Sequence, residues 1–189
     1  MKQSILKLIF VATICSLALI ACAPQSPTPQ GGGEDQPTAQ NTEVGVPATP
    51  VPDTGETLVT VQDNQPAPGL AESWTVSEDG LDYVFQLKTG AVFGDNTPVN
   101  ADAVNANFNR WFDPNDPARG SGSYEAWAAA FGGFKGEKDE AGVPKSVFDG
   151  IEKVDNFTVL IHLNKPFADL LTVLAQPDFA IVSPASFNK

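Results

Sequence analysis

Cysteine and histidine are nearly absent from this sequence of 189 residues. Its two cysteines are Cys15 and Cys22, and its one histidine is His162. Cys15 lies in an apolar N-terminal segment of the kind that is cleaved off on secretion, so the remaining chain can form no internal disulfide and no thiol cluster for a metal. One imidazole cannot form a catalytic dyad, and we expect a structural role for His162. The chain also lacks a Gly-x-Ser-x-Gly elbow and a Walker loop. We predict no enzyme activity and no cofactor.

Positive charge is also scarce. The sequence has 11 lysines and arginines against 23 acidic residues, and removal of residues 1–21, which contain Lys2 and Lys7, leaves nine basic residues and a net charge of −14. A charge this negative repels nucleic acid and anionic lipid headgroups, and it favours solubility. We therefore predict no nucleic-acid partner.

The longest apolar run is too short to span a membrane. Residues 8–20 are almost uninterruptedly apolar, follow Lys2 and Lys7, and lead into Ala21 and Cys22. A short apolar run with a basic start and a small residue at its end is typical of a secretory signal rather than a transmembrane helix. The pattern resembles a bacterial lipoprotein signal, which predicts a signal peptide over residues 1–21 and lipid attachment at Cys22. The alternative is an ordinary signal peptide cleaved nearby, with Cys22 incidental.

Residues 22–54 are predicted to be a lipid-anchored, disordered linker. They are rich in proline, glutamine, threonine and glycine and have no apolar period, so they cannot bury enough surface to become ordered. Such a spacer holds a folded domain away from the membrane, while two or three acyl chains on Cys22 bind that membrane firmly. We expect an extracytoplasmic protein, in the periplasm or at the cell surface, anchored through Cys22.

Residues 55–189 have the pattern of a folded domain. Alternating apolar residues predict strands over residues 73–76, 82–88 and 157–163. The same sequence predicts a short β-prone run at residues 58–61, a rigid turn at 66–69, a helix beginning at Pro166 and a last short strand over 179–182. Because strands and helices interleave, we expect a mixed α/β fold with a sheet at its centre.

A further helix is expected between Asn100, a suitable N-cap, and Asp113, which precedes a proline. One side of this helix is an apolar stripe, and the other is predicted to turn three asparagines away from it, namely Asn105, Asn107 and Asn109.

An aromatic segment bounded by glycines offers the candidate ligand contacts. A short helical face after the loop at residues 120–123 carries Tyr124, Trp127 and Phe131. Aromatic side chains beside glycine loops can line a ligand pocket. The alternative is that Trp127 and Phe131 are simply core residues, whereas Tyr124 has a hydroxyl at the junction of loop and helix. We select Tyr124 and Trp127 as candidate ligand-binding residues.

Taken together, the domain resembles the solute-binding lipoproteins of peptide-class ABC importers, the family 5 group that includes oligopeptide, dipeptide and nickel receptors. The matching segments are residues 68–74, 79–80, 83–88, 92–110, 131–136, 159–166 and 179–184. The resemblance implies part of the first lobe of a type 2 periplasmic-binding fold, in a two-lobed receptor that closes over peptides or similar solutes and delivers them to a membrane permease. In some relatives the aromatic segment lies near the ligand cleft.

Two departures from the family affect the functional prediction. The linker leads directly into the segment around Glu56, where relatives have an earlier strand and helix, and the sequence ends at Lys189, where relatives continue into a second lobe. We therefore expect a fragment of lobe I with weak or no solute affinity by itself. Two alternatives are a lipid-anchored interaction module completed by a separately encoded part, and an extracytoplasmic enzyme, which the shortage of nucleophiles and metal ligands disfavours.

Overall fold

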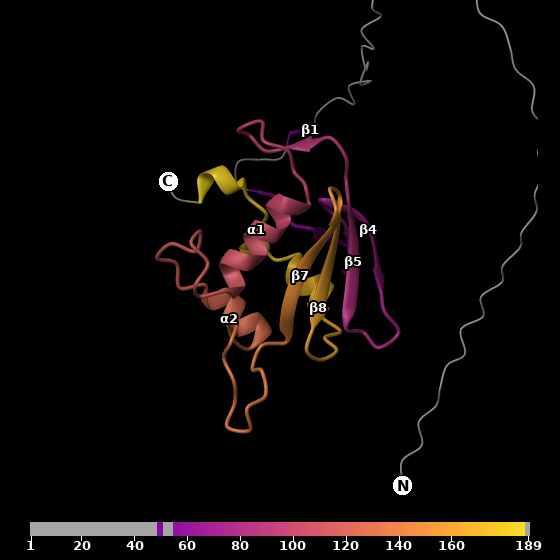
Figure 1. Cartoon of the computed structure of the whole chain (residues 1–189). Helices are drawn as coiled ribbons and strands as arrows, with labels where there is room; N and C mark the ends of the chain where they lie inside the picture. Colours follow the sequence, from indigo (N-terminus) through magenta and orange to yellow (C-terminus); the bar gives the residue numbers. More distant parts are fainter. Residues whose placement is uncertain (1–48, 51–54, 188–189) are drawn as a thin grey trace, which may run out of the picture. The chain divides into compact units, whose positions relative to one another are not determined.

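The computed structural model describes residues 49–50 and 55–187, which include nearly all of the predicted folded domain (Figure 1). The predicted signal peptide, Cys22 and most of the predicted linker lie outside the described residues. No helix in the described part of the chain is long and apolar enough to cross a membrane.

A four-stranded antiparallel sheet forms the centre of the domain. Its strands lie in the order β4 (Ala71–Val76), β5 (Asp82–Leu87), β8 (Thr158–Leu163) and β7 (Phe148–Asp155). The alternation predicted for β5 is confirmed, because Tyr83, Phe85 and Leu87 are buried and the residues between them are half-exposed. Since successive side chains of a strand point to opposite faces, these residues place the core on one face of the sheet.

The first two helices in the described part of the chain contribute to this core. The helix α1 (Ala101–Phe112) packs against β7 and β8, and α2 (Glu125–Phe131) follows it along the chain (Figure 1). The predicted start of α1 is confirmed, since Asn100 Oδ1 accepts a hydrogen bond from the Ala103 backbone N–H at 2.9 Å. Its end is also as predicted, because the residue before a proline avoids helical angles and Asp113 is the C-cap.

The prediction that Asn107 faces away from the core is wrong. Its side chain is completely buried, and Nδ2 donates hydrogen bonds to the carbonyl oxygens of Ala103 at 2.9 Å and Val182 at 2.8 Å. An amide can occupy this apolar surrounding because its donors are satisfied by backbone oxygens. Asn109 is exposed, as expected for the outer face of α1.

The rigid turn predicted at residues 66–69 is also wrong. Residues Gln65–Pro68 form strand β3, which pairs antiparallel with β2 (Val59–Gln62). The turn begins three residues earlier, at Asp63 and Asn64, whose φ angles are 50° and 61°. A two-residue hairpin turn of type I′ needs positive φ at both central residues, and Asn and Asp accept that conformation more readily than most residues.

A short parallel pair forms a separate two-stranded sheet. Strand β1 (Thr49–Pro50) pairs with β6 (Ala91–Val92). Thr49 and Pro50 fall inside the segment predicted as linker, so backbone pairing extends a few residues before the predicted start of the domain at residue 55.

The last part of the chain has less regular structure than predicted. The helix α3 (Leu170–Leu174) begins four residues after Pro166, so Pro166 does not occupy its first position. In place of the predicted strand over residues 179–182, the structure has the short helix η1 (Pro177–Phe179) and a single β-bridge between Ile181 and Glu56. A second short helix, η2 (Pro184–Ser186), follows.

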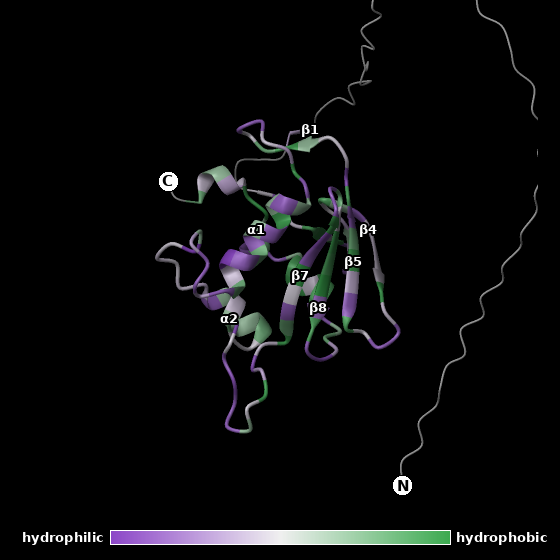
Figure 2. Ribbon diagram, viewed as in Figure 1, coloured by the Kyte–Doolittle hydropathy of each residue, from purple (hydrophilic) through white to green (hydrophobic). Residues whose placement is uncertain are grey.

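The distribution of hydrophobic residues agrees with this arrangement. In Figure 2, β8 is mostly hydrophobic, while the loop that joins α2 to β7 is mostly hydrophilic. That loop is largely exposed. The core lies between the sheet and the helices α1 and α2, and it also includes buried residues of β2, α3 and the last segment, such as Val59, Leu170 and Ile181.

Candidate functional site

Tyr124 and Trp127, the two predicted ligand-binding residues, line the same pocket. This pocket, which we call the aromatic pocket, has a volume of about 260 Å³. It is formed by the last turn of α1, the beginning of α2 and η1. Its lining residues are Arg110, Trp111, Tyr124, Glu125, Ala126, Trp127, Asp178 and Phe179.

Trp127 belongs both to the core and to the pocket wall. Only 1% of its surface is exposed, and its ring lies 4.3 Å from that of Phe131 and 5.0 Å from that of Phe148, measured between centroids. Offset and edge-to-face ring pairs at such distances add to the stability gained from burial. The indole Nε1, however, is buried without a hydrogen-bond partner among the described residues. An unpaired buried donor is uncommon, since it loses its contact with water without compensation.

Tyr124 is held in a fixed position at the edge of the pocket. Its backbone has a φ of 52°, a left-handed conformation that is unusual for an aromatic residue. Its hydroxyl donates a hydrogen bond to the carbonyl oxygen of Arg119 at 2.7 Å, and the Arg119 guanidinium lies 4.4 Å from the ring centroid. Gly122 packs beneath the ring, because a Cβ atom there would come within 2.7 Å of Tyr124 Cε2. Backbone and side-chain contacts therefore both fix the tyrosine.

Arg119 links Tyr124 to the end of α1. Its Nη1 donates to the carbonyl oxygens of Arg110 at 3.0 Å and Trp111 at 2.6 Å. These carbonyls lie in the last turn of α1, where helical partners are missing and a positive charge is favourable. The other neighbour of the guanidinium is the Phe134 ring, 4.5 Å away. Sequence reasoning missed this role, because nothing local to Arg119 indicates which carbonyls it meets.

Charged side chains surround the mouth of the aromatic pocket. Glu125 and Asp178 are exposed, and neither forms an ion pair within the part of the chain that the structure describes. Arg110 is half-buried, with its guanidinium 4.1 Å from the centroid of the Phe187 ring. The lining therefore carries two carboxylates and one guanidinium on aromatic walls. Asp178 lies more than fifty residues from Tyr124 in the sequence, so its presence here could not be predicted from spacing.

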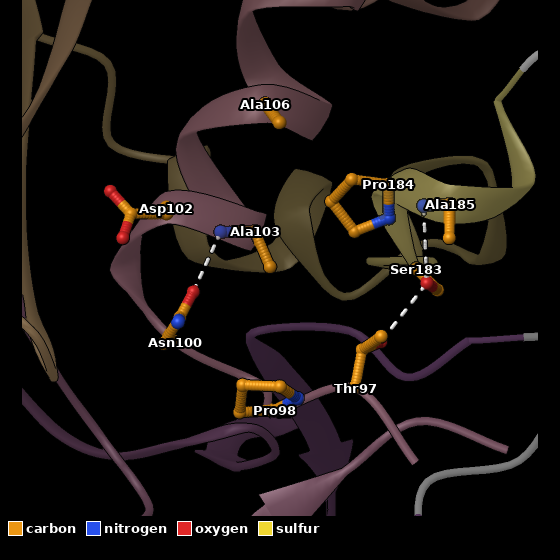
Figure 3. A pocket seen from close by; sticks show the side chains of 9 residues that line it. All are labelled: Thr97, Pro98, Asn100, Asp102, Ala103, Ala106, Ser183, Pro184 and Ala185. Atoms are coloured by element: carbon orange, nitrogen blue, oxygen red, sulfur yellow. Dashed lines mark hydrogen bonds between the residues drawn. The ribbon is translucent and has the colours of Figure 1, made fainter. Parts of the chain in front are cut away.

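A second pocket, of about 300 Å³, lies at the start of α1 (Figure 3). Its walls are mostly proline and alanine side chains. Figure 3 shows the hydrogen bond from Ala103 to Asn100 and the contact between Thr97 and Ser183, whose oxygens are 3.1 Å apart. Ser183 also donates to Asp95 Oδ2 at 2.6 Å. These contacts join the loop before α1 to η2, which indicates a structural role for this region.

His162 lies on strand β8 and is not one of the residues that line the aromatic pocket. Its Nδ1 is 2.7 Å from Asp82 Oδ1 on β5, and its Nε2 is 3.9 Å from Glu152 Oε1 on β7. The side chain therefore connects three neighbouring strands, as a structural residue would.

The fold and pocket define a class before any relative is considered. A mixed α/β lobe whose pocket combines aromatic walls with a few charged groups is suited to binding a small molecule. Comparison with known proteins identifies the family. The family model for bacterial extracellular solute-binding proteins, family 5, matches residues 65–189. The chain belongs to the family 5 bacterial extracellular solute-binding proteins.

Curated relatives and solved structures agree with this assignment. The glutathione-binding protein GsiB is 36% identical over 120 residues in Escherichia coli O1:K1 and 35% identical in strain K12, an alignment that covers 64% of this chain and 19% of GsiB. The chain therefore spans about a fifth of the length of the curated relatives it matches.

Among solved structures, HbpA2 from Haemophilus parasuis superimposes with a TM-score of 0.55 at 30% identity, over 69% of this chain and 25% of that one. The periplasmic binding protein DppA from Helicobacter pylori in complex with peptide STSA has a TM-score of 0.53 at 27% identity, also over 69% and 25%. These matches confirm the predicted fold class, part of a periplasmic-binding-protein fold.

Proposed function

We propose that this chain serves as the extracytoplasmic solute-binding component of an ABC importer for peptides or similar solutes, in association with membrane permease subunits. Family membership supports the proposal, and so do two relatives whose ligands are peptides, the glutathione-binding protein and DppA in complex with a tetrapeptide. The protein would act by capture and delivery rather than by catalysis.

The observation that carries the proposal for this molecule is the aromatic pocket itself. Its walls combine the rings of Trp111 and Phe179 with the charged groups of Arg110 and Asp178, which is the mixture of apolar surface and a few polar groups that ligand sites use. A volume of about 260 Å³ is small for a complete ligand, because ligand sites usually measure about 300–1,000 Å³. We infer that the pocket takes one residue-sized group of a solute.

We also propose that the 189-residue chain by itself binds a solute weakly. A receptor that captures by closure needs contacts from two sides of the ligand. The alignment with family members covers 19–25% of their length, so most of a relative's chain lies outside the aligned segment. We propose that this chain alone contacts a solute through one wall.

A lipid on Cys22 would complete this function. We propose that the anchor and the following linker keep the domain close to the permease, where even a weakly held solute can be transferred. The alternative of an interaction module has less support, because the large exposed hydrophobic residues among those described are four valines in separate segments: Val61, Val76, Val143 and Val154.

Spectroscopic titration tests the proposal. Addition of a pool of di- to tetrapeptides to the uniformly ¹⁵N-labelled chain should shift amide resonances of residues lining the aromatic pocket and leave those around His162 unchanged. The proposal is contradicted if the shifts are confined to the sheet around His162, or if no resonance shifts at about 10 mM peptide. That concentration fills about nine tenths of a site with a Kd of about 1 mM.

A further inference from the structure

The only histidine of the sequence lies between two carboxylates on the sheet, outside the aromatic pocket. His162 on β8, Asp82 on β5 and Glu152 on β7 belong to three neighbouring strands (Figure 1). The side chain of His162 is 32% exposed, that of Asp82 46% and that of Glu152 69%. All three side chains are therefore accessible to ions in solution.

The contact with Asp82 determines which ring nitrogen of a neutral His162 is free. His162 Nδ1 lies 2.7 Å from Asp82 Oδ1. Because a carboxylate can only accept a hydrogen bond, the neutral ring donates from Nδ1 and carries its proton there. The lone pair of Nε2 then remains available on the side of Glu152. A carboxylate that fixes the imidazole tautomer in this way is the usual second partner of a metal-binding histidine.

Nε2 of the neutral ring and the Glu152 carboxylate cannot satisfy one another. Both are acceptors, and Glu152 Oε1 lies 3.9 Å from His162 Nε2. A cation between them would satisfy both. Two ligands of one tetrahedral zinc ion lie about 3.4 Å apart, as follows from Zn–N and Zn–O bonds of about 2.0–2.2 Å. Rotation of the exposed Glu152 side chain can supply the difference.

Charge and space at this position also favour a cation. Two carboxylates beside a neutral ring give the three side chains a net charge of −2, which attracts divalent ions. Gly150 lies directly opposite His162 on β7, and a Cβ atom there would meet nothing within 4 Å. Since opposite residues of an antiparallel pair share a face of the sheet, the space beside the ring is open to water.

We propose that His162 Nε2 and the Glu152 carboxylate bind a divalent transition-metal ion such as Zn²⁺, with Asp82 as the residue that orients the imidazole. Imidazole is a ligand that suits zinc, copper and nickel, whereas Mg²⁺ prefers oxygen ligands. No group of three or more metal-binding side chains occurs in the described residues, so water completes the coordination. The site lies on the sheet, and the inference does not depend on the proposed function.

The test follows the imidazole ¹H–¹⁵N resonances of the untagged full chain, which need no assignment because His162 is the only histidine. Cys15→Ser and Cys22→Ser are included so that no thiol competes for the metal. At about pH 7.5, where an ordinary histidine is neutral, the ring should carry its proton on Nδ1. Zn²⁺ should then shift the Nε2 resonance, and Mg²⁺ at the same concentration should leave it unchanged.

Matched variants distinguish this site from general attraction to an acidic protein. Asp82→Asn should raise the Kd for Zn²⁺ about tenfold, since loss of an orienting carboxylate costs about 10–100-fold in metal affinity. Glu152→Gln, which removes a charged ligand, should raise the Kd at least as much. Glu140→Gln, at an exposed acid in the loop between α2 and β7, is the control and should leave it unchanged.

Three results would overturn the inference. The first is a ring that carries its proton on Nε2 in the absence of metal, because Asp82 would then not orient it. The second is an equal response of the His162 ring to Zn²⁺ and Mg²⁺. The third is the same Kd for Zn²⁺ in E152Q and E140Q, which would mean that Glu152 is not a ligand. None of these results affects peptide binding at the aromatic pocket.

Discussion

Asn107 in α1 and Val182 near the end of the chain form a reciprocal pair of hydrogen bonds. Asn107 Nδ2 donates to the Val182 carbonyl oxygen at 2.8 Å, and the Val182 backbone N–H donates to Asn107 Oδ1 at 3.3 Å. The side-chain amide thus takes the place of a neighbouring strand for this part of the backbone. The pair fixes the segment between η1 and η2 against the helix, and η1 supplies Asp178 and Phe179 to the aromatic pocket.

Replacement of Asn107 by alanine should therefore lower the free energy of unfolding by about 2 kcal/mol, because it leaves the Val182 backbone groups without partners. Urea denaturation measures the change. Asn109→Ala, on the exposed side of the same helix, is the control and should change stability by less than about 0.5 kcal/mol. Equal effects of the two substitutions would show that the hydrogen bonds to Val182 are unimportant.

Gly122→Ala should disturb the position of Tyr124. The added methyl group would come within 2.7 Å of the tyrosine ring, so the ring or the loop that carries Gly122 must shift. We expect a loss of about 1 kcal/mol in stability and changed amide resonances at the aromatic pocket. Gly150→Ala is the matched control, because a Cβ atom at that position meets nothing within 4 Å. Unchanged pocket resonances in G122A would contradict the assigned contact.

Stability should depend on pH through Asp113. The hydrogen bond from Lys135 Nζ, at 2.7 Å, holds the pKa of Asp113 below its ordinary value of 3.8, and a hydrogen bond from the Asn115 backbone acts in the same direction. A carboxyl group whose pKa is lower in the folded state than in the unfolded state contributes stability above the unfolded pKa and loses it as the pH falls through the folded pKa.

The difference in stability between the wild-type chain and D113N should therefore be largest near neutral pH and should vanish below the depressed pKa of Asp113. Urea midpoints measured from about pH 7 to about pH 2 give this profile. Lys135→Met should reproduce part of the loss at neutral pH, whereas Lys138→Met, at an exposed lysine without an ion pair among the described residues, should not. A difference independent of pH would exclude the carboxylate charge as its cause.

Cys22→Ser should release the protein from the membrane fraction. Lipid chains on Cys22 would supply most of the membrane affinity, because the domain is acidic and repels anionic headgroups. Cell fractionation and the intact mass of the purified protein measure anchoring and acylation together. A wild-type protein that is soluble and has an unmodified Cys22 contradicts the prediction.

The chain by itself should be only slightly stabilised by peptides. At a ligand concentration equal to Kd, binding stabilises a protein by about 0.4 kcal/mol, which corresponds to about 2 °C in the melting temperature of a domain of this size. Melting curves with and without a peptide mixture test this expectation. A rise of several degrees would contradict the proposal of a single contacting wall.

The local sequence was sufficient to predict those features whose physical cause lies within a few residues along the chain. The start of α1 depends on the Asn100 side chain reaching Ala103, and its end on the proline after Asp113. The alternation along β5 similarly reports one buried face. Strand β7 was missed because it lies at the edge of the sheet with mostly exposed residues, so its apolar period is weak. Strand β3 was missed because its two prolines resemble a turn.

By itself, the sequence determined the alternation of strands and helices, the family and the position of Cys22, the candidate for lipid attachment. It also identified Tyr124 and Trp127 as candidate ligand-binding residues. Each of these predictions depends on residue types and on their spacing over a few turns. Only the tertiary structure decided that Asn107 is buried and that Asp178 joins Tyr124 and Trp127 at one pocket. The reason is that hydrogen bonds and charges act over a few ångströms of space. Which distant residues come within that range is decided by the packing of α1, α2 and η1.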